Sequence, residues 1–118
     1  MQENKPQETK AWDKDILLER VLHNQEIYLA VLKVFIEEIP QLSKKLKDEI
    51  LKGNFKDIAS IAHNIKGSAF NITANILGAI ASYIEKAAKE KNIDEISKLS
   101  HLLDEQLRFL LAELNAQI

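Results

Sequence analysis

Hydrophobic residues recur at intervals of three and four positions along nearly the whole chain after residue 11. Because an α-helix turns about 100° per residue, this spacing places them on one face of a helix. The pattern predicts a short helix and four long ones, over Trp12 to about Val21, about Gln25 to Leu51, about Phe55 to Asn71, Ala74 to about Lys89, and Asn92 to the end of the sequence. No alternating strand pattern and no glycine-rich phosphate loop competes with this interpretation.

The inward-facing positions of these helices form the predicted core. In chain order they are Ile16, Leu17 and Val21; Tyr28, Val31, Phe35, Ile39, Leu42, Leu46 and Ile50; Ile58, Ile61, Ala62, Ile65, Ala69 and Ile72; Leu77, Ile80, Ala81, Ile84 and Ala88; and Ile96, Leu99, Leu103, Leu107, Leu110 and Leu114.

Capping residues mark the helix ends. Asp13 is a plausible N-cap for the first helix, and Asn92 with Glu95 three residues later has the form of a helix start. Gly53 is suited to end the second helix and Asn54 to begin the third. Short connections therefore separate the long helices, and short connections make neighbouring helices antiparallel.

Pro40 interrupts the second predicted helix. Proline removes a backbone donor and clashes with the preceding turn, so we expect a kink or a split near Ile39. With that reservation, the fold class predicted for residues 12–118 is all-α: an up-down-up-down antiparallel four-helix bundle with a short additional N-terminal helix that covers one end. Residues 1–11 are polar, contain Pro6 and lack periodicity, so we expect a flexible tail or a linker remnant.

Composition places the chain among small soluble modules. Its 118 residues suffice for one domain, and without cysteine it has neither disulfide nor thiol chemistry. No apolar run approaches the roughly 18 residues of a membrane span, and the N-terminus lacks an apolar secretory core. We therefore expect a cytoplasmic monomer that does not insert into membranes.

The charge is unevenly distributed. The net charge is −2, but residues 44–66 contain six lysines against three acidic residues, which gives +3 there and −5 elsewhere. A basic face of this kind would favour a partner with an acidic pocket. Because the chain has only two arginines and no interleaving of basic and aromatic residues, we do not expect nucleic-acid binding.

His63 is the candidate for chemistry. On a helical wheel it lies roughly 150° from the centre of the apolar stripe of its helix, so its imidazole should be exposed. An imidazole with an ordinary pKa near 6.5 is partly neutral at cytoplasmic pH and then carries a free ring-nitrogen lone pair. Such a group can accept a phosphoryl group without a separate base.

Two neighbours of His63 fit the same chemistry. Lys66, one turn away, could neutralise charge on phosphoryl oxygens. Gly67 at i+4 costs the helix about 1 kcal/mol relative to alanine, and close approach of a partner protein would explain its presence. Taken alone, however, an exposed histidine and lysine on a helix are most often ordinary surface residues.

The remaining candidates are weaker. His23 and His101 are expected on the surface, and because no histidine belongs to a Glu-x-x-His pair, we predict no metal site. No serine or threonine has a histidine and an acid that could form a hydrolytic triad. Phe70, at i+7 from His63, is either an exposed apolar contact for a partner or a side chain folded over the end of the bundle.

The stretch HNIKGSAFNITANILGAIASYIEK resembles the signature of histidine-containing phosphotransfer domains, the HPt family of multistep phosphorelays. The matching residues are His63, Lys66, Gly67, Ser68, Ala69, Ala74, Leu77 and Glu85, with Ile65 and Ile84 as conservative variants. The similarity runs from about Trp12 to Leu114. One departure is Thr73, where the family usually has glycine, and we expect either Asn71 to adopt the left-handed conformation or Thr73 to cap the next helix.

The resemblance implies a phosphocarrier that is neither a kinase nor another enzyme. Nε2 of His63 would accept a phosphoryl group from the aspartyl phosphate of one receiver domain, in a response regulator or hybrid histidine kinase, and pass it to another receiver. Lys66 would stabilise the phosphoryl charge, while Gly67 with nearby residues such as Ala59 and Phe70 would contact the partner. No cofactor is expected on this domain, and Mg²⁺ would belong to the receiver. The alternative is a helical-bundle adaptor that binds receivers or kinases without being phosphorylated.

Overall fold

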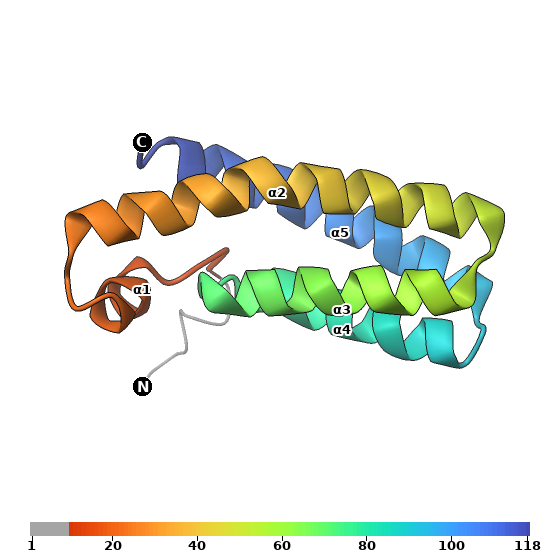
Figure 1. Ribbon diagram of the computed structural model, residues 1–118. Coiled ribbons are helices and arrows are strands. Elements are labelled where there is room, and N and C mark those ends of the chain that lie inside the picture. The colour runs from red at the N-terminus through yellow and green to blue at the C-terminus, as the bar shows by residue number, and fades with distance from the viewer. Residues whose placement is uncertain (1–9) are drawn as a thin grey trace, which may run out of the picture.

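The computed structural model describes residues 10–118, which form an antiparallel bundle of four long helices with a short helix at one end (Figure 1). The helices are α1 (Lys14–Arg20), α2 (Gln25–Lys52), α3 (Phe55–Asn71), α4 (Asn75–Lys89) and α5 (Ile93–Asn115). Helix α3 packs against α2 and α4, and α5 closes the bundle against the same two helices. The predicted fold class is confirmed. None of the helices in this part of the chain combines the length and the apolar character that a membrane span requires.

The core follows the predicted apolar stripes closely. All six predicted core residues of α5 are buried, as are four of the stripe in α3, and the large side chains with essentially no exposure are Leu17, Leu32, Ile39, Leu46, Ile58, Ile65, Ile72, Leu77, Ile84, Ile96, Leu103 and Leu110. Ile16 and Leu32 differ clearly from the prediction. Ile16 is 39% exposed because α1 is a single short helix that buries only Leu17, whereas Leu32 is fully buried although it was not predicted. The inner face of α2 therefore includes Leu32, and Val31 lies at its edge.

The predicted capping residues begin and end the helices. Side-chain oxygens of Asp13, Asn54 and Asn92 each accept a hydrogen bond from the backbone N–H three residues further on. Gly53 ends α2 in the left-handed conformation, with a φ of 69°. Ala11, at the end of the predicted tail, is buried in the core, and residues 1–9 of that tail lie outside the described residues.

Helix α2 continues through Pro40, so the predicted split does not occur. Proline in a helix costs about 3 kcal/mol because a backbone hydrogen bond is lost. The side chain of Pro40 is exposed, but Ile39, Ser43 and Leu46, near it on α2, are buried. Tertiary packing of α2 along α3 and α5 therefore outweighs the local cost, as is usual for helices within a bundle.

The turn between α3 and α4 differs from both expectations. Thr73 itself adopts the left-handed conformation, with a φ of 65°, and the N-cap of α4 is Ala74, which makes no side-chain capping bond. Glycine is the residue that adopts this conformation at least cost, which explains the family preference, and a β-branched residue there is strained. Thr73 has a compensating role. Its buried hydroxyl accepts a hydrogen bond from the Asp13 N–H at 2.7 Å and donates one to the Asp13 carbonyl at 2.9 Å.

A second contact joins α1 to the end of α3. Nη1 of Arg20 donates hydrogen bonds to the carbonyl oxygens of Phe70, at 2.9 Å, and Asn71, at 3.4 Å. Carbonyls in the last turn of a helix lack intrahelical partners and attract cations. The short N-terminal helix thus fixes the C-terminal end of the helix that carries His63.

Replacement of Thr73 by valine is expected to lower the free energy of unfolding by about 1 to 3 kcal/mol, because the buried N–H of Asp13 loses its partner while the backbone strain stays. Urea denaturation followed by circular dichroism measures this change. Thr73→Ser is the matched control and should retain most of the stability, since it keeps the hydroxyl. Equal stability of the valine variant and the unchanged protein would contradict a structural role for the hydroxyl.

Candidate functional site

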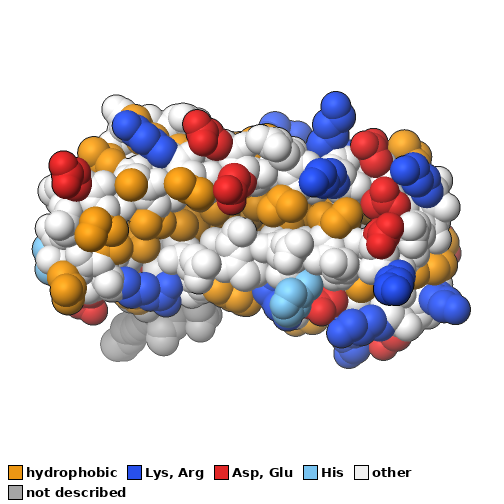
Figure 2. All heavy atoms as spheres, viewed as in Figure 1, with side chains coloured by type: hydrophobic (Ala, Val, Ile, Leu, Met, Phe, Trp, Pro, Cys, Tyr) orange, Lys and Arg blue, Asp and Glu red, His pale blue; other side chains and the backbone are white. Residues whose placement is uncertain are grey.

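His63 lies on the outer face of α3, as the helical wheel predicted. Its side chain is 63% exposed, whereas Ile58, Ala62 and Ile65 on the opposite face are buried. Figure 2 shows a histidine side chain and several basic side chains standing out from the side of the molecule that α3 forms. The imidazole is therefore open to a partner on one side while its helix is fixed in the bundle.

The imidazole contacts one carboxylate from the neighbouring helix. Nδ1 of His63 lies 3.3 Å from Oε2 of Glu85, on α4. Nζ of Lys66 lies 3.0 Å from Oε1 of the same carboxylate, and Nζ of Lys89 lies 3.3 Å from Oε2. Glu85 is the most buried member, with its side chain 13% exposed. These four residues form one cluster across α3 and α4, which we call the His63–Glu85 cluster.

Two opposing effects set the ionisation of Glu85. Partial burial alone would raise the pKa of its carboxyl, but hydrogen bonds from Lys66 and Lys89, the charge of Lys66 and the contact with His63 together lower that pKa below its usual value. The carboxyl group is therefore negatively charged at neutral pH and at mildly acidic pH.

The lowered pKa predicts how stability depends on acid. A carboxyl group whose pKa is lower in the folded protein stabilises it above the unfolded-state pKa, about 4.3 for glutamate, and this contribution is lost as the pH falls through the folded-state pKa. We expect the free energy of unfolding of the unchanged protein to fall more steeply below about pH 4.3 than that of Glu85→Gln. Urea midpoints across this pH range measure the difference. Glu90→Gln, an exposed change at the C-cap of α4, should follow the unchanged protein, and identical acid profiles for all three proteins would contradict the prediction.

Gly67 has no structural need to be glycine. It lies within α3, and a Cβ atom built there would have no neighbour within 4 Å. A glycine in a helix interior destabilises it by roughly 0.5 to 1 kcal/mol relative to alanine. Packing within the chain does not explain this cost, and the open space at Gly67, one turn from His63, leaves room for the predicted contact with a partner.

The other two predicted contact residues are less open than Gly67. Ala59 is half-buried on α3, one turn before His63. Phe70 is 40% exposed, and its ring packs over Gly78 of α4, where a Cβ would come within 2.7 Å of a ring carbon. Phe70 thus covers α4 with one face and offers only part of its ring to solvent.

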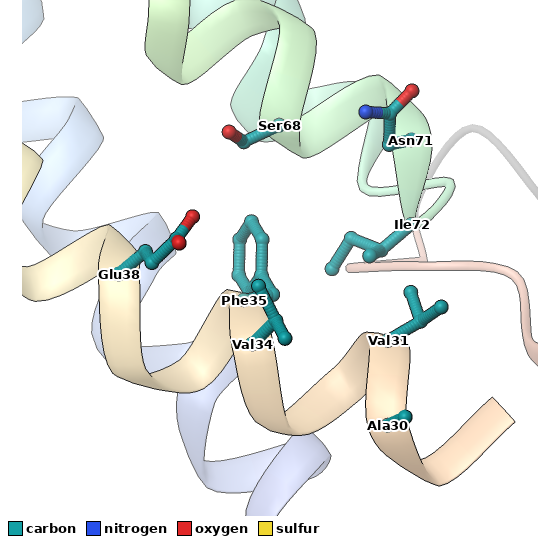
Figure 3. Close-up of a pocket in the computed structure, with 8 residues that line it drawn as sticks. All are labelled: Ala30, Val31, Val34, Phe35, Glu38, Ser68, Asn71 and Ile72. Atoms are coloured by element: carbon teal, nitrogen blue, oxygen red, sulfur yellow. The ribbon is translucent and has the colours of Figure 1, made fainter. Parts of the chain in front are cut away.

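An apolar groove runs between α2 and α3 (Figure 2). One pocket in it has a volume of about 310 Å³ and is lined by Ala30, Val31, Val34, Phe35 and Glu38 of α2, Ser68 and Asn71 of α3, and Ile72 just after it. Figure 3 shows the ring of Phe35 standing between the two helices, with Ile72 pointing toward it. Ser68 follows Gly67 directly, so the groove begins within one turn of Gly67 along α3.

Sequence reasoning missed part of the site. Glu85 was noted only as a position in a family pattern, and Lys89 was not singled out. The i,i+4 spacing of Glu85 and Lys89 was a usable signal, but their approach to His63 depends on how α3 and α4 pack. Two lysines of the predicted basic face are paired with acidic side chains. Lys47 forms an ion pair with Asp104 of α5, and Lys52 forms one with Glu49.

The other histidines do not form comparable sites. His23 lies in the turn between α1 and α2 and His101 lies on α5, and both are exposed. Within residues 10–118, no group of three or more histidine, aspartate or glutamate side chains is arranged to hold a metal ion.

Comparison with known proteins identifies similar molecules. The family model described as "Hpt domain" matches residues 30–117. The structure is similar to the crystal structure of histidine-containing phosphotransfer protein B (HptB) from Pseudomonas aeruginosa PAO1, with a TM-score of 0.86, 16% sequence identity, and coverage of 92% of this chain and 95% of that one. It is also similar to the HPT domain of a sensor hybrid histidine kinase from Shewanella, with a TM-score of 0.79, 16% identity, and coverage of 92% and 96%. No curated protein sequence matches the chain.

Proposed function

This chain belongs to the Hpt domain family and has a histidine phosphotransfer role in a phosphorelay, and on that premise we propose that His63 is the residue that carries the phosphoryl group. One observation carries this proposal. His63 is the histidine whose imidazole is exposed on one side and contacts a charged cluster on the other. Among residues 10–118, in contrast, no ion pair involves His23 or His101.

The proposed reaction is transfer from an aspartyl phosphate of a receiver domain, in a response regulator or a hybrid kinase. The lone pair of Nε2 forms a bond to phosphorus, and the bond between phosphorus and the aspartate oxygen breaks, so the aspartate leaves as a carboxylate. Transfer to a second receiver is the same exchange in reverse. Such transfers depend mainly on position and on neutralising the charge of the equatorial oxygens. Lys66 supplies a positive charge within one turn of the imidazole.

This scheme determines what the receiver and this domain each contribute. Mg²⁺ and the acidic pocket belong to the receiver, and this domain contributes no cofactor. It acts as a phosphocarrier without autonomous kinase activity. The sequence supports this part of the proposal because it contains no glycine-rich phosphate loop.

The receiver would dock on the surface formed by Gly67 and the groove between α2 and α3. Gly67 lets a partner backbone approach the helix closely, and the groove offers apolar side chains, including Val34, which is 51% exposed. An α-helix rises 1.5 Å per residue, so Ser68 to Ile72 lie about 7 to 14 Å beyond His63 along α3. A receiver domain of ordinary size can cover both His63 and this groove.

Phosphoryl transfer from a panel of receiver domains, each phosphorylated on its aspartate, tests the proposed function. Phosphohistidine is labile in acid and stable in base, and we expect incorporation with this signature from at least one receiver. Binding of a phosphorylated receiver without any incorporation, in a panel where a known phosphotransfer domain is labelled, would overturn the carrier function in favour of an adaptor.

A further inference from the structure

One side of α5 carries large apolar side chains that the bundle does not cover. Leu102 is 50% exposed and Phe109 is 55% exposed. They are seven residues apart and therefore lie on the same side of the helix. On α4, Tyr83 is 61% exposed and lines a hollow together with Glu95 and Leu99 of α5, so its ring extends this apolar surface. Exposed apolar surface that is continuous in this way is typical of a site that binds another protein.

This surface does not overlap the proposed phosphotransfer site. Asp104 and Leu111, which line a hollow with side chains of α2, lie roughly opposite Leu102 and Phe109 on a helical wheel. The exposed apolar side chains of α5 are therefore on its α4 side. Because α5 packs against α2 and α4, the groove between α2 and α3 lies on the other side of the bundle. A partner that covers the α4 side of α5 leaves His63 and that groove open.

Opposite charges lie at the two ends of this part of α5. Lys98 precedes Leu102 by four residues and Glu113 follows Phe109 by four, a spacing that keeps the four side chains on one side of the helix. We call these four residues the α5 stripe. Lys98 and Glu113 are exposed, and no ion pair within residues 10–118 involves either of them. In chain order the α5 stripe is a cation, two apolar residues and an anion, so the same stripe in the reverse direction is complementary to it.

We propose that the α5 stripe is a dimer interface, in which a second copy of this chain packs its α5 antiparallel to the first about a two-fold axis. A symmetric contact of this kind requires a surface that is complementary to itself. With the axis between residues 105 and 106, Leu102 of each copy lies against Phe109 of the other, and Lys98 of each copy lies against Glu113 of the other. Composition alone favoured a monomer, because it does not show which apolar residues the folded bundle leaves exposed.

The dimensions of α5 suit this packing. An α-helix rises 1.5 Å per residue, so the 23 residues of α5 extend about 35 Å. With Tyr83 of both copies beside it, such a contact can approach the roughly 800 Å² per partner that stable interfaces bury. Glu105 lies close to the axis, but it is exposed and turned about 60° from Leu102, away from α4. Its charge can therefore stay in solvent in both copies.

Exchange of the end charges tests this geometry. Sedimentation equilibrium should give a mass that rises with concentration from 13.4 kDa toward twice that value for the unchanged protein. Lys98→Glu and Glu113→Lys should each weaken self-association about tenfold at low ionic strength, because both end contacts of the dimer become like-charged. An equimolar mixture of the two variants should associate at least as well as the unchanged protein, since a mixed dimer has opposite charges at both ends.

Two results of this experiment would overturn the proposal. One is a mass of 13.4 kDa for the unchanged protein at every concentration up to about 1 mM. The other is a mixture of Lys98→Glu and Glu113→Lys that associates no better than either variant alone, because the antiparallel arrangement requires the mixed dimer to recover.

Removal of the aromatic ring tests the apolar part of the interface. Phe109→Ala deletes one ring from each copy and should weaken self-association about 100-fold. Leu51→Ala, which truncates an 86% exposed side chain at the C-terminal end of α2, is the matched control and should associate normally. Circular dichroism confirms that both variants are folded. Undiminished association of a folded Phe109→Ala protein would overturn the proposal.

Phosphoryl transfer to the same variants separates the dimer from the proposed function. Phe109→Ala and Leu51→Ala should both accept phosphate from a phosphorylated receiver as the unchanged protein does, because neither residue lies near His63. A loss of transfer in Phe109→Ala, together with a monomeric unchanged protein, would show that the α5 stripe binds a receiver instead of a second copy. Failure of every receiver to transfer phosphate would overturn the proposed function, and the masses would still decide the dimer.

Discussion

Replacement of His63 by glutamine abolishes phosphoryl incorporation and leaves the helix content unchanged: this is the largest effect that we expect. The side chain is 63% exposed, so its replacement costs little stability. Glutamine is a good helix former of similar length, and it can still contact Glu85. What it lacks is a nucleophilic nitrogen. Incorporation of labelled phosphate from a phosphorylated receiver and the far-ultraviolet circular dichroism spectrum measure the two parts of this prediction.

The other two histidines provide matched controls. His23→Gln and His101→Gln remove the same group from exposed positions in the α1–α2 turn and on α5. Both should incorporate phosphate as the unchanged protein does. Incorporation that persists in His63→Gln, or that is lost in either control, would contradict the assignment of His63.

Replacement of Gly67 by glutamine has the second largest expected effect. Transfer should fall about 100-fold, since a misplacement of about 1 Å at the reacting groups can cost that much. The isolated protein should at the same time become more stable by roughly 0.5 to 1 kcal/mol, because glycine is a poor helix former and the new side chain points into open space. Transfer assays and urea denaturation of the same preparation measure both changes.

Opposite signs for stability and transfer separate a docking role from a structural one. Gly67→Ala should share the gain in stability with a much smaller loss of transfer. Ala112→Gln introduces the same side chain at an exposed position on α5, which lies diagonally across the bundle from α3, and should transfer normally. If Gly67→Gln transferred at the normal rate, no partner would approach α3 closely at this point.

Local sequence rules predicted most of the fold. The apolar stripe of each long helix could be predicted from the spacing of its hydrophobic residues. The side chains of Asp13, Asn54 and Asn92 make the capping bonds that their positions indicated. The errors arose where tertiary contacts outweigh local preference. Pro40 stays within α2 because its neighbours are buried, and Thr73 tolerates a left-handed backbone because its hydroxyl binds the backbone of Asp13, 60 residues earlier in the sequence.

The same distinction between local pattern and tertiary packing applies to the site. Exposure of His63 could be predicted from the angle between it and the apolar stripe, because both belong to one helix. The cluster around Glu85 could not, because it depends on how α3 packs against α4 and brings Lys66 within 3.0 Å of a residue 19 positions later. The groove between α2 and α3 was missed for the same reason: Val34 has no special spacing, and only the packing of two helices shows that it lines an open apolar surface.

The location of the phosphoryl group on the phosphorylated protein is the most direct test of the central claim. The protein, labelled with nitrogen-15, is phosphorylated by a charged receiver, and coupling between phosphorus-31 and the ring nitrogens is measured by NMR in base-stable conditions. We predict a single phosphoryl group on Nε2 of His63. A phosphoryl group on Nδ1, on His23 or His101, or on no histidine would contradict the claim.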